Sequence, residues 1–202
     1  MVTRGAPSPV DALPTEERIL RATIDGLTQL DPAALTIQQI CRAAEVTAPT
    51  IYYHFGNKDG LLAAAVEQLV TDWLAMIDAA VSREGSLDQT LEQAIGVWEV
   101  TITAPTRPIA VFAWATLLLA GSSQECRDAL LRARDRSLTL VTEALANYVD
   151  ELRAGELASL VIDAVVAAAL QYELDKDPVA LRARLDGLSR LVGASAALDR
   201  LG

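Results

Sequence analysis

The sequence predicts an all-α protein of about nine helices, and three observations support this fold class. Apolar residues recur at intervals of three and four positions through most of the 202-residue chain. Residues that start helices, such as Thr36 with Gln39 and Ser86 with Gln89, precede several of these periodic segments. The composition agrees, because 51% of the residues are hydrophobic and only 8 are prolines. We therefore expect one or two helical domains with a sizeable core.

The beginning of the chain differs from the rest. Residues 1–14 contain three prolines and one glycine and no apolar signal core, so they predict a disordered leader rather than a targeting peptide. Cytoplasmic localisation follows as the default. The first helix covers about residues 15–30, with periodic apolar positions from Ile19 onward, and it ends before Pro32.

Two short helices separated by a tight turn follow the first helix. Thr36 and Gln39 form a capping box at the start of one, because their side chains satisfy amide groups that lack a helical partner. Residues 44–46 are too few for anything but a sharp turn to the other, which Thr47 caps and which has Pro49 in its first turn. Aromatic and hydrogen-bonding side chains gather at one edge of this second helix, as entry into a major groove requires. The segment predicts a helix-turn-helix that binds DNA.

A long fourth helix is predicted from its cap Asn57 to about Val81, and at ~1.5 Å per residue it is roughly 35 Å long. We expect it to act as a lever between the DNA-binding domain and the remainder of the chain. A fifth helix begins after Ser86, and a breaker at residues 104–108 separates it from a sixth that ends near Gly121.

Three further helices complete the predicted chain. The seventh extends from about Ser123 to Leu152, and its clustered arginines predict a solvated face paired with nearby acids. Gly155 closes the connection to the eighth helix. Asp177 and Pro178 open the ninth as its cap and first residue.

The helix-turn-helix segment resembles the amino-terminal domain of the TetR (tetracycline-repressor-like) transcriptional regulators. The shared pattern consists of residues 36–40 (TIQQI), 43–46 (AAEV), 49–55 (PTIYYHF), 57–59 (NKD) and 61–62 (LL). The resemblance spans residues 15–62. It implies a leader at 1–14, a DNA-binding domain at 15–62, and an effector-binding and dimerisation domain at 63–202.

The resemblance also implies which residues bind DNA. Phosphate contacts are expected from Thr36, Tyr52, His54 and Lys58. Base specificity is expected from Gln38, Thr47, Thr50 and Tyr53. The complete predicted set is Thr36, Gln38, Thr47, Ala48, Pro49, Thr50, Tyr52, Tyr53, His54 and Lys58.

Two residues depart from the family pattern. Ala48 cannot hydrogen-bond a base edge, but its methyl group can touch a thymine methyl. Glu45 stands where the family usually has the turn glycine, so either the backbone there avoids positive φ or the turn tolerates roughly 1 kcal/mol of strain. We expect a distorted turn rather than the loss of the motif.

The charge balance opposes DNA binding. The net charge is -10, and residues 1–60 contain five Arg or Lys against seven Asp or Glu, a local sum of about -2. The DNA-facing side of the helix that Thr47 caps is less acidic than the chain as a whole. Arg4 in the leader is expected to add a contact with DNA. We expect weak non-specific affinity with strong salt sensitivity, because few cations supply the gain from counterion release.

Two apolar stripes near the C-terminus predict an assembly surface. The stripes lie on residues 157–172 and 181–192. Within one chain they could simply pack on each other. Small residues such as Ala164 and Ala168 permit close helix approach, and the resemblance implies a four-helix homodimer interface. Such a dimer would bind a palindromic operator.

Residues 86–174 are expected to hold an effector pocket. Bulky apolar groups, with a few polar groups among them, fall on three predicted helices there. The predicted lining is Trp98, Glu99, Ile102, Phe112, Thr116, Asp163 and Tyr172. This set suits a small lipophilic ligand with one hydrogen-bonding or cationic group opposite Glu99 or Asp163.

Other classes of site find little support. His54 is the only histidine, and neither a Ser-His-Asp set, nor Cys/His ligand spacing, nor a glycine-rich phosphate loop occurs, so we expect no catalytic centre, metal or cofactor. Cys41 and Cys126 are expected to be buried thiols. The longest apolar run, residues 109–121, is shorter than the ~18 to 20 residues of a membrane span.

The sequence therefore predicts a dimeric transcriptional regulator, a repressor that a small lipophilic effector releases from its operator. Two alternatives stay open. One is a ligand-carrying or partner-binding protein of the same fold with weakened DNA binding, and the other is an all-α enzyme that works in the cavity.

Overall fold

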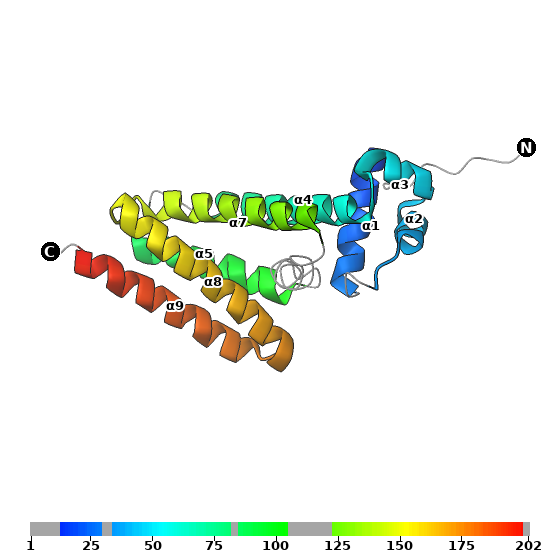
Figure 1. Ribbon diagram of the computed structural model, residues 1–202. Coiled ribbons are helices and arrows are strands. Elements are labelled where there is room, and N and C mark those ends of the chain that lie inside the picture. The colour runs from blue at the N-terminus through cyan, green and yellow to red at the C-terminus, as the bar shows by residue number, and fades with distance from the viewer. Residues whose placement is uncertain (1–12, 30–33, 82–84, 105–122, 200–202) are drawn as a thin grey trace, which may run out of the picture.

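The computed structural model describes residues 13–29, 34–81, 85–104 and 123–199. These residues form eight helices and no strand, so the all-α prediction is confirmed for this part of the chain. In chain order the helices are α1 (Thr15–Gln29), α2 (Ile37–Ala44), α3 (Ala48–Phe55), α4 (Lys58–Ala80), α5 (Leu87–Thr103), α7 (Gln124–Leu145), α8 (Glu151–Asp175) and α9 (Pro178–Asp199) (Figure 1). The predicted sixth helix and most of the predicted leader lie outside the described residues.

The three N-terminal helices pack around a small core at one end of the molecule (Figure 1). α1 lies against α2 and against the first half of α4, while α3 contacts α2 and α4. Ile19, Ile51 and Leu61 are completely buried in this core, and Ile40 is almost so. Because one isoleucine from each of the three helices meets α4 there, apolar packing fixes the angle between α2 and α3.

The predicted helix starts are largely confirmed. Thr36 Oγ1 accepts a hydrogen bond from the N–H of Gln39 at 3.2 Å, and Gln39 Oε1 accepts one from the N–H of Thr36 at 2.8 Å. Asn57 caps α4 by accepting from the N–H of Gly60 at 2.8 Å. Thr47 stands at the cap position of α3 but does not cap it through its hydroxyl, so that part of the prediction is wrong.

The turn between α2 and α3 contains a residue in the left-handed region. Glu45 has φ 54° and ψ 46°, a conformation that costs a non-glycine residue roughly 1 kcal/mol. Of the two expected alternatives, the structure therefore has positive φ. The N–H of Val46 donates to the carbonyl of Cys41 at 3.0 Å, which closes α2 in the way a glycine turn does.

The predicted boundary between the seventh and eighth helices is wrong. Residues 146–150 separate α7 from α8, so Gly155 lies inside α8. The side chain of Asp150 caps the new helix. Tyr148, in the intervening turn, donates its hydroxyl to the carbonyl of Gly85 at 3.0 Å. This contact joins residues far apart in the sequence, so helical periodicity could not reveal it.

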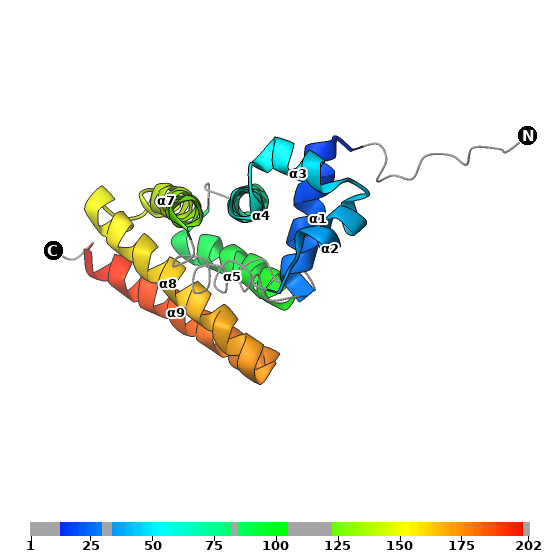
Figure 2. The same cartoon turned by 45° about the vertical axis from the view of Figure 1, so that its right-hand side comes forward.

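The long helix α4 connects the N-terminal helices with the rest, and α7 lies along it (Figures 1 and 2). The first turns of α7 enter the N-terminal core, where Cys126 and Leu130 are buried together with Leu62 and Val66 of α4. The core of the N-terminal helices is therefore completed by a helix that begins about 60 residues later in the chain.

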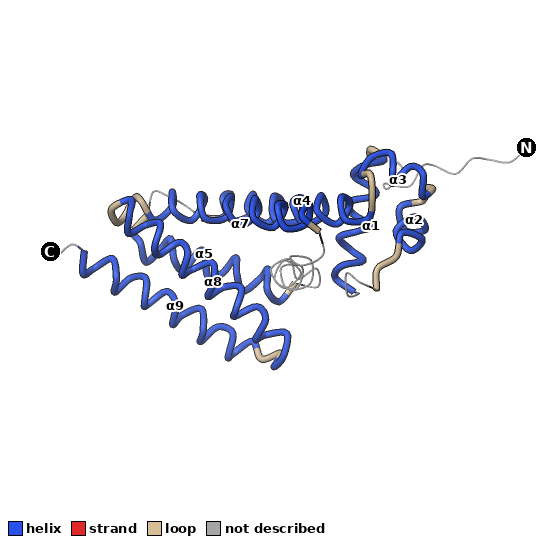
Figure 3. Tube along the Cα trace, in the orientation of Figure 1, coloured by secondary structure: helices blue, strands red, loops and turns tan. Residues whose placement is uncertain are grey.

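A second, larger core lies between the end of α4 and helices α5, α7, α8 and α9 (Figure 3). Most of the two predicted apolar stripes is packed inside this core, where Val161, Leu181 and Leu185 are buried. The stripes thus pack largely within the chain. Leu160 and Leu191 remain outside, 57% and 62% exposed, so a narrower apolar face is left on α8 and α9.

Two helices of the described part, α4 and α8, are long and apolar enough to cross a membrane by length and composition alone. Half of the apolar window of α4 and 39% of that of α8 are buried against other helices of the chain. Core helices of a helical bundle pass the same test. The uninterrupted-run criterion missed both helices because isolated charges such as Glu67 and Asp163 interrupt them.

Gly60, in the first turn of α4, leaves no room for a side chain. A Cβ there would collide with the carbonyl oxygen of Phe55 and lie 2.9 Å from Oε1 of Glu125. We expect Gly60→Ala to lower the free energy of unfolding by about 1–3 kcal/mol through strain. Gly96→Ala in α5 is the matched control, because no neighbouring atom lies within 4 Å of its Cβ position. It should raise that free energy by about 0.5–1 kcal/mol in the same urea titration. Equal changes in the two variants would contradict the steric explanation.

Candidate DNA-binding surface and effector cavity

Helix α3 is anchored mainly by Ile51, with Phe55 packed against the same core, and it exposes its aromatic residues Tyr52 and Tyr53 to solvent. Ile51 is its buried residue. Tyr53 is 85% exposed, Tyr52 is 47% exposed, and His54 is also exposed. Large aromatic side chains left in solvent on a firmly anchored helix indicate a contact surface for a partner.

None of the ten residues predicted to bind DNA is buried. Ala48, Thr50 and Lys58 are half-buried, and the other seven are exposed. They come from the start of α2, from α3 and from the first residue of α4, which lie at the same end of the molecule (Figure 2). The structure brings the predicted residues to one region, and their contacts with DNA stay a prediction.

The threonine hydroxyls of this region already have local hydrogen bonds. Thr36 Oγ1 donates to Oε1 of Gln39 at 2.7 Å, so a phosphate would have to compete with the capping box for this donor. The hydroxyl oxygens of Thr47 and Thr50 are 3.0 Å apart, and one donates to the other. That pair retains one hydroxyl proton that can be given to a ligand.

The aromatic side chains at the end of α3 support one another. The rings of Tyr53 and His54 meet edge to face, with centroids 5.3 Å apart. His54 also lies against Phe55, with centroids 6.0 Å apart. Contacts of this kind contribute about 0.5–1.5 kcal/mol each and restrict the rings. The phenol of Tyr53 therefore extends into solvent from a supported position.

Two arginines of α7 hold the middle of α4. Arg132 contacts Oε1 of Glu67 through both Nη2 and Nε, at 2.6 and 2.8 Å. Arg136 donates to the hydroxyl of Thr71 at 2.9 Å. Arg134 points the other way, to Asp163 of α8 at 2.8 Å. Of the arginines predicted to pair with nearby acids, Arg132 and Arg134 therefore pair with acids of the two neighbouring helices.

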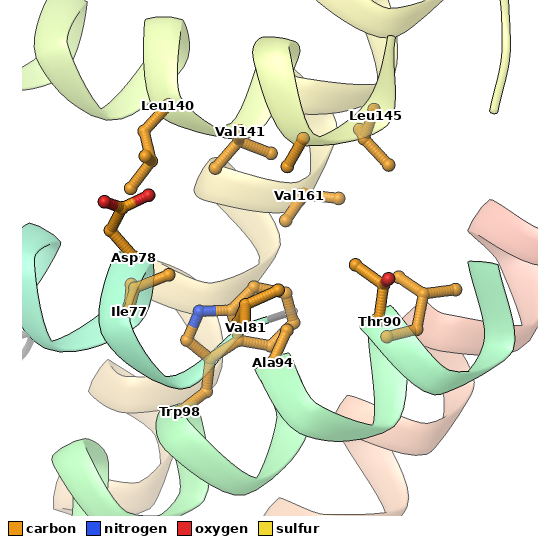
Figure 4. Close-up of a pocket in the computed structure, with 12 residues that line it drawn as sticks. Ile77, Asp78, Val81, Thr90, Ala94, Trp98, Leu140, Val141, Leu145 and Val161 are labelled. Carbon is orange, nitrogen blue, oxygen red and sulfur yellow. The ribbon is translucent and has the colours of Figure 1, made fainter. Parts of the chain in front are cut away.

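An apolar cavity of about 50 Å³ lies at the other end of α4, between α4, α5, α7 and α8 (Figure 4). Its described lining is aliphatic except for Asp78, Thr90 and the indole of Trp98. The aliphatic residues are Ile77, Val81, Leu91, Ala94, Leu140, Val141, Ala144, Leu145 and Val161.

Among the residues predicted to bind the effector, Trp98 lines this cavity. Ile102 is completely buried in the surrounding core, and Tyr172 is half-buried with Nζ of Lys176 5.4 Å from its ring centroid. Phe112 and Thr116 lie outside the described residues.

The two predicted carboxylates lie in ion pairs instead of in the cavity wall. Glu99 is 3.3 Å from Nη1 of Arg182, and Asp163 pairs with Arg134. Hydrogen bonds to Asp186 and then Glu92 hold the pKa of Arg182 above its usual range, so this guanidinium keeps its charge and its partners.

The sequence reasoning missed the side of the cavity that α7 supplies. Helical spacing of apolar residues in α7 could have predicted it, at Leu140, Val141, Ala144 and Leu145. The clustered arginines earlier in the same helix instead favoured the prediction of a solvated face. Thr90 was also missed. Its hydroxyl is 2.7 Å from that of Tyr148, a pairing that joins positions 58 residues apart.

No group of three His, Cys, Asp or Glu side chains in the described ranges could hold a metal ion. Both cysteines are free thiols. Cys126 is buried, as expected, and Cys41 is half-buried.

Residues 19–65 match the model of a protein family described as bacterial regulatory proteins, tetR family. The chain is 33% identical over 78 residues to the HTH-type transcriptional regulator BetI 2 of Chromohalobacter salexigens, a match covering 39% of this chain and 36% of that relative. It is 26% identical over 123 residues to BetI of Stenotrophomonas maltophilia, covering 60% of this chain and 62% of the relative. The chain therefore matches about a third to three fifths of the length of these relatives.

The fold is similar to solved structures over most of its length. A transcriptional regulator from Rhodococcus sp. Rha1 superposes with a TM-score of 0.76 at 21% identity, covering 89% of this chain and 96% of that one. At this identity the similarity establishes the arrangement of helices and leaves the ligand of each protein a separate question.

Tyr53 offers the cleanest test of the α3 surface, because its side chain is almost entirely in solvent. We expect Tyr53→Ala to weaken binding to the duplex upstream of the gene by roughly 10- to 100-fold in fluorescence anisotropy, at about 1–3 kcal/mol for a lost contact. Its melting temperature should match the wild type. Val100→Ala removes another exposed apolar side chain, on α5, and should leave DNA binding unchanged. If Tyr53→Ala binds the duplex as tightly as the wild type, Tyr53 does not belong to the DNA-binding surface.

Proposed function

The chain belongs, through its N-terminal domain, to the tetR family of bacterial regulatory proteins, and on this premise we propose that it is a dimeric repressor whose operator binding responds to a small apolar effector. The observation that carries the proposal is the exposed aromatic face of α3, which is anchored by Ile51 and opens onto solvent. A supported helix with donors and rings on its outer face suits the major groove of DNA. We expect the protein to act in the cytoplasm, where its operator is.

A homodimer would place two such helices on one operator. The candidate interface is the apolar face that α8 and α9 leave uncovered, with Leu160 and Leu191 exposed. A groove of about 350 Å³ runs beside it and is lined by small residues such as Ala164 and Ala167. A two-fold arrangement through this face would present two α3 helices to half-sites about 34–36 Å apart.

The cavity supports a response to a ligand. At about 50 Å³ it is smaller than the ~300–1,000 Å³ of ordinary ligand pockets, so an effector has to displace parts of its wall. Ile77 and Asp78 of α4 form part of that wall, and the other end of the same helix is packed in the N-terminal core. An effector that prefers the widened cavity would therefore shift the position of α3 and lower operator affinity.

The alternatives are less well supported. A carrier with a silent DNA-binding domain would not require an exposed, supported row of aromatic residues on α3. An enzyme working in the cavity would require a reacting group, and the described lining is almost entirely aliphatic.

The proposed function is tested with the duplex upstream of the gene, measured by anisotropy at two salt concentrations with unrelated DNA as competitor. We expect competitor-resistant binding that weakens steeply with salt, because phosphate contacts release counterions. Binding no better than to the competitor would favour the carrier, and turnover of a compound in the cavity would favour the enzyme.

The dimer is tested by placing charges on the exposed face of α8 and α9. Leu160→Glu combined with Leu191→Glu should convert the dimer to a monomer in light scattering, because the charges would be buried without partners. Operator affinity should fall at least 100-fold, since one weak contact surface replaces two. Val100→Glu alters an exposed residue of α5 and should stay dimeric. A doubly substituted protein that remains dimeric would place the interface elsewhere.

A further inference from the structure

The sequence of α3 lacks the side chains that usually distinguish bases by hydrogen bonds. Its eight residues, APTIYYHF, include no Arg, Lys, Asn, Gln, Asp or Glu. Arg and Lys ordinarily read guanine, Asn and Gln read adenine, and Asp and Glu accept from cytosine. The nitrogen-bearing side chain of α3, His54, belongs to its last turn, where the ring contacts those of Tyr53 and Phe55. A bidentate bond from α3 to a purine is therefore not available.

The hydrogen-bonding groups at the start of α3, residues 47–50, are partly engaged within the protein. The hydroxyl oxygens of Thr47 and Thr50 are 3.0 Å apart, so this pair has one proton left for a base. The N–H groups of Thr50 and Ile51 donate to the carbonyl of Thr47 at 3.0 and 3.3 Å. Pro49 has no N–H to give. The start of α3 consequently offers little hydrogen bonding to a base edge.

The same residues carry small apolar groups that solvent reaches. Ala48 and Thr50 are half-buried, and Pro49 is exposed. The helix lies at the end of the molecule away from α9 (Figure 1). A recognition helix contacts base edges mainly through its N-terminal residues. The apolar group that the major groove displays is the C5-methyl of thymine, so these residues favour thymine over the other bases.

The carboxamide of the predicted DNA-binding set points to the same base pair. Gln38 lies in the first turn of α2, and its side chain is exposed. An amide of this kind forms two hydrogen bonds with adenine, which pairs with thymine. The apolar start of α3 and the amide of α2 therefore both favour A·T pairs.

We propose that α3 recognises its operator through thymine methyl groups, which pack against Ala48 and the γ-methyl of Thr50. The base pairs beneath the start of α3 are then A·T pairs. A G·C pair would present polar base atoms to methyl groups that cannot bond with them. This inference rests on the proposed function, because it names the base chemistry that the DNA-binding surface of the regulator selects.

The test begins with duplexes that the full-length protein selects from a random-sequence pool. We expect A·T pairs at the selected positions. Replacing every thymine of a selected duplex by uracil removes only the C5-methyl groups. Anisotropy should then show roughly tenfold weaker binding, because each of two half-sites loses a methyl contact. Replacing guanine by 7-deazaguanine removes the N7 acceptor and should change affinity by less than about twofold.

Substitutions at Thr50 assign the effect to a methyl group. Thr50→Ser removes the γ-methyl and keeps the hydroxyl, so it should weaken binding to the thymine duplex roughly three- to tenfold and reduce the loss caused by uracil. Ala48→Gly added to Thr50→Ser should abolish that loss. Thr50→Val removes the hydroxyl but keeps the methyl, and should retain the full loss. Thr139→Ser, at an exposed residue of α7, is the matched control and should behave as the wild type.

The outcomes separate this inference from the proposed function. Equal binding of the thymine and uracil duplexes would overturn it, as would a larger loss with 7-deazaguanine. A full uracil effect in the variant that combines Ala48→Gly with Thr50→Ser would also overturn it. In all three cases sequence-specific binding, and with it the proposed regulator, would stand. If the protein selects no sequence over unrelated DNA, both the inference and the proposed function fail.

Discussion

The packing of α7 along α4 is the contact on which both ends of the molecule depend. At one end, Cys126 and Leu130 complete the core beneath the DNA-binding helices, and at the other end the same two helices line the cavity. Burial of a leucine contributes about 1.5–3 kcal/mol, whereas an exposed ion pair such as that of Arg132 and Glu67 contributes about 0–1 kcal/mol. Apolar packing therefore provides most of the strength of this contact.

This arrangement changes the expected role of α4. A single lever would pivot freely at the N-terminal core, but α7 is buried in that core beside it. Gly60, at the start of α4, leaves room for the backbone carbonyl of Phe55, and the carboxylate of Glu125 from α7 also approaches it. The first halves of α4 and α7 consequently form one body with the DNA-binding helices. In the proposed response to an effector, a displacement that starts at Ile77 would be transmitted through two helices rather than one.

In the part of the molecule formed by α5, α7, α8 and α9, charged side chains lie on the surface and the cavity is mainly apolar. Charged side chains are joined in pairs that link helices, as Arg182 links α9 to Glu92 and Glu99 of α5. The described lining of the cavity is aliphatic except for Asp78, Thr90 and Trp98.

The sequence by itself determined the local features. Helix periodicity predicted the all-α fold, the residues at Thr36 and Asn57 predicted helix starts, and the pattern from Pro49 to Phe55 predicted the DNA-binding motif. These succeed because caps, turns and amphipathic faces depend on residues within about four positions of one another.

Only the tertiary structure decided which distant residues meet. The break at residues 146–150 depends in part on the contact of Tyr148 with Gly85, and the cavity excludes Glu99 and Asp163 because each finds an arginine on another helix. The apolar stripes on α8 and α9, which could have packed against a second chain, pack mainly against helices of the same chain. The physical reason is that burial and ion pairing across helices depend on three-dimensional proximity, which helical periodicity does not encode.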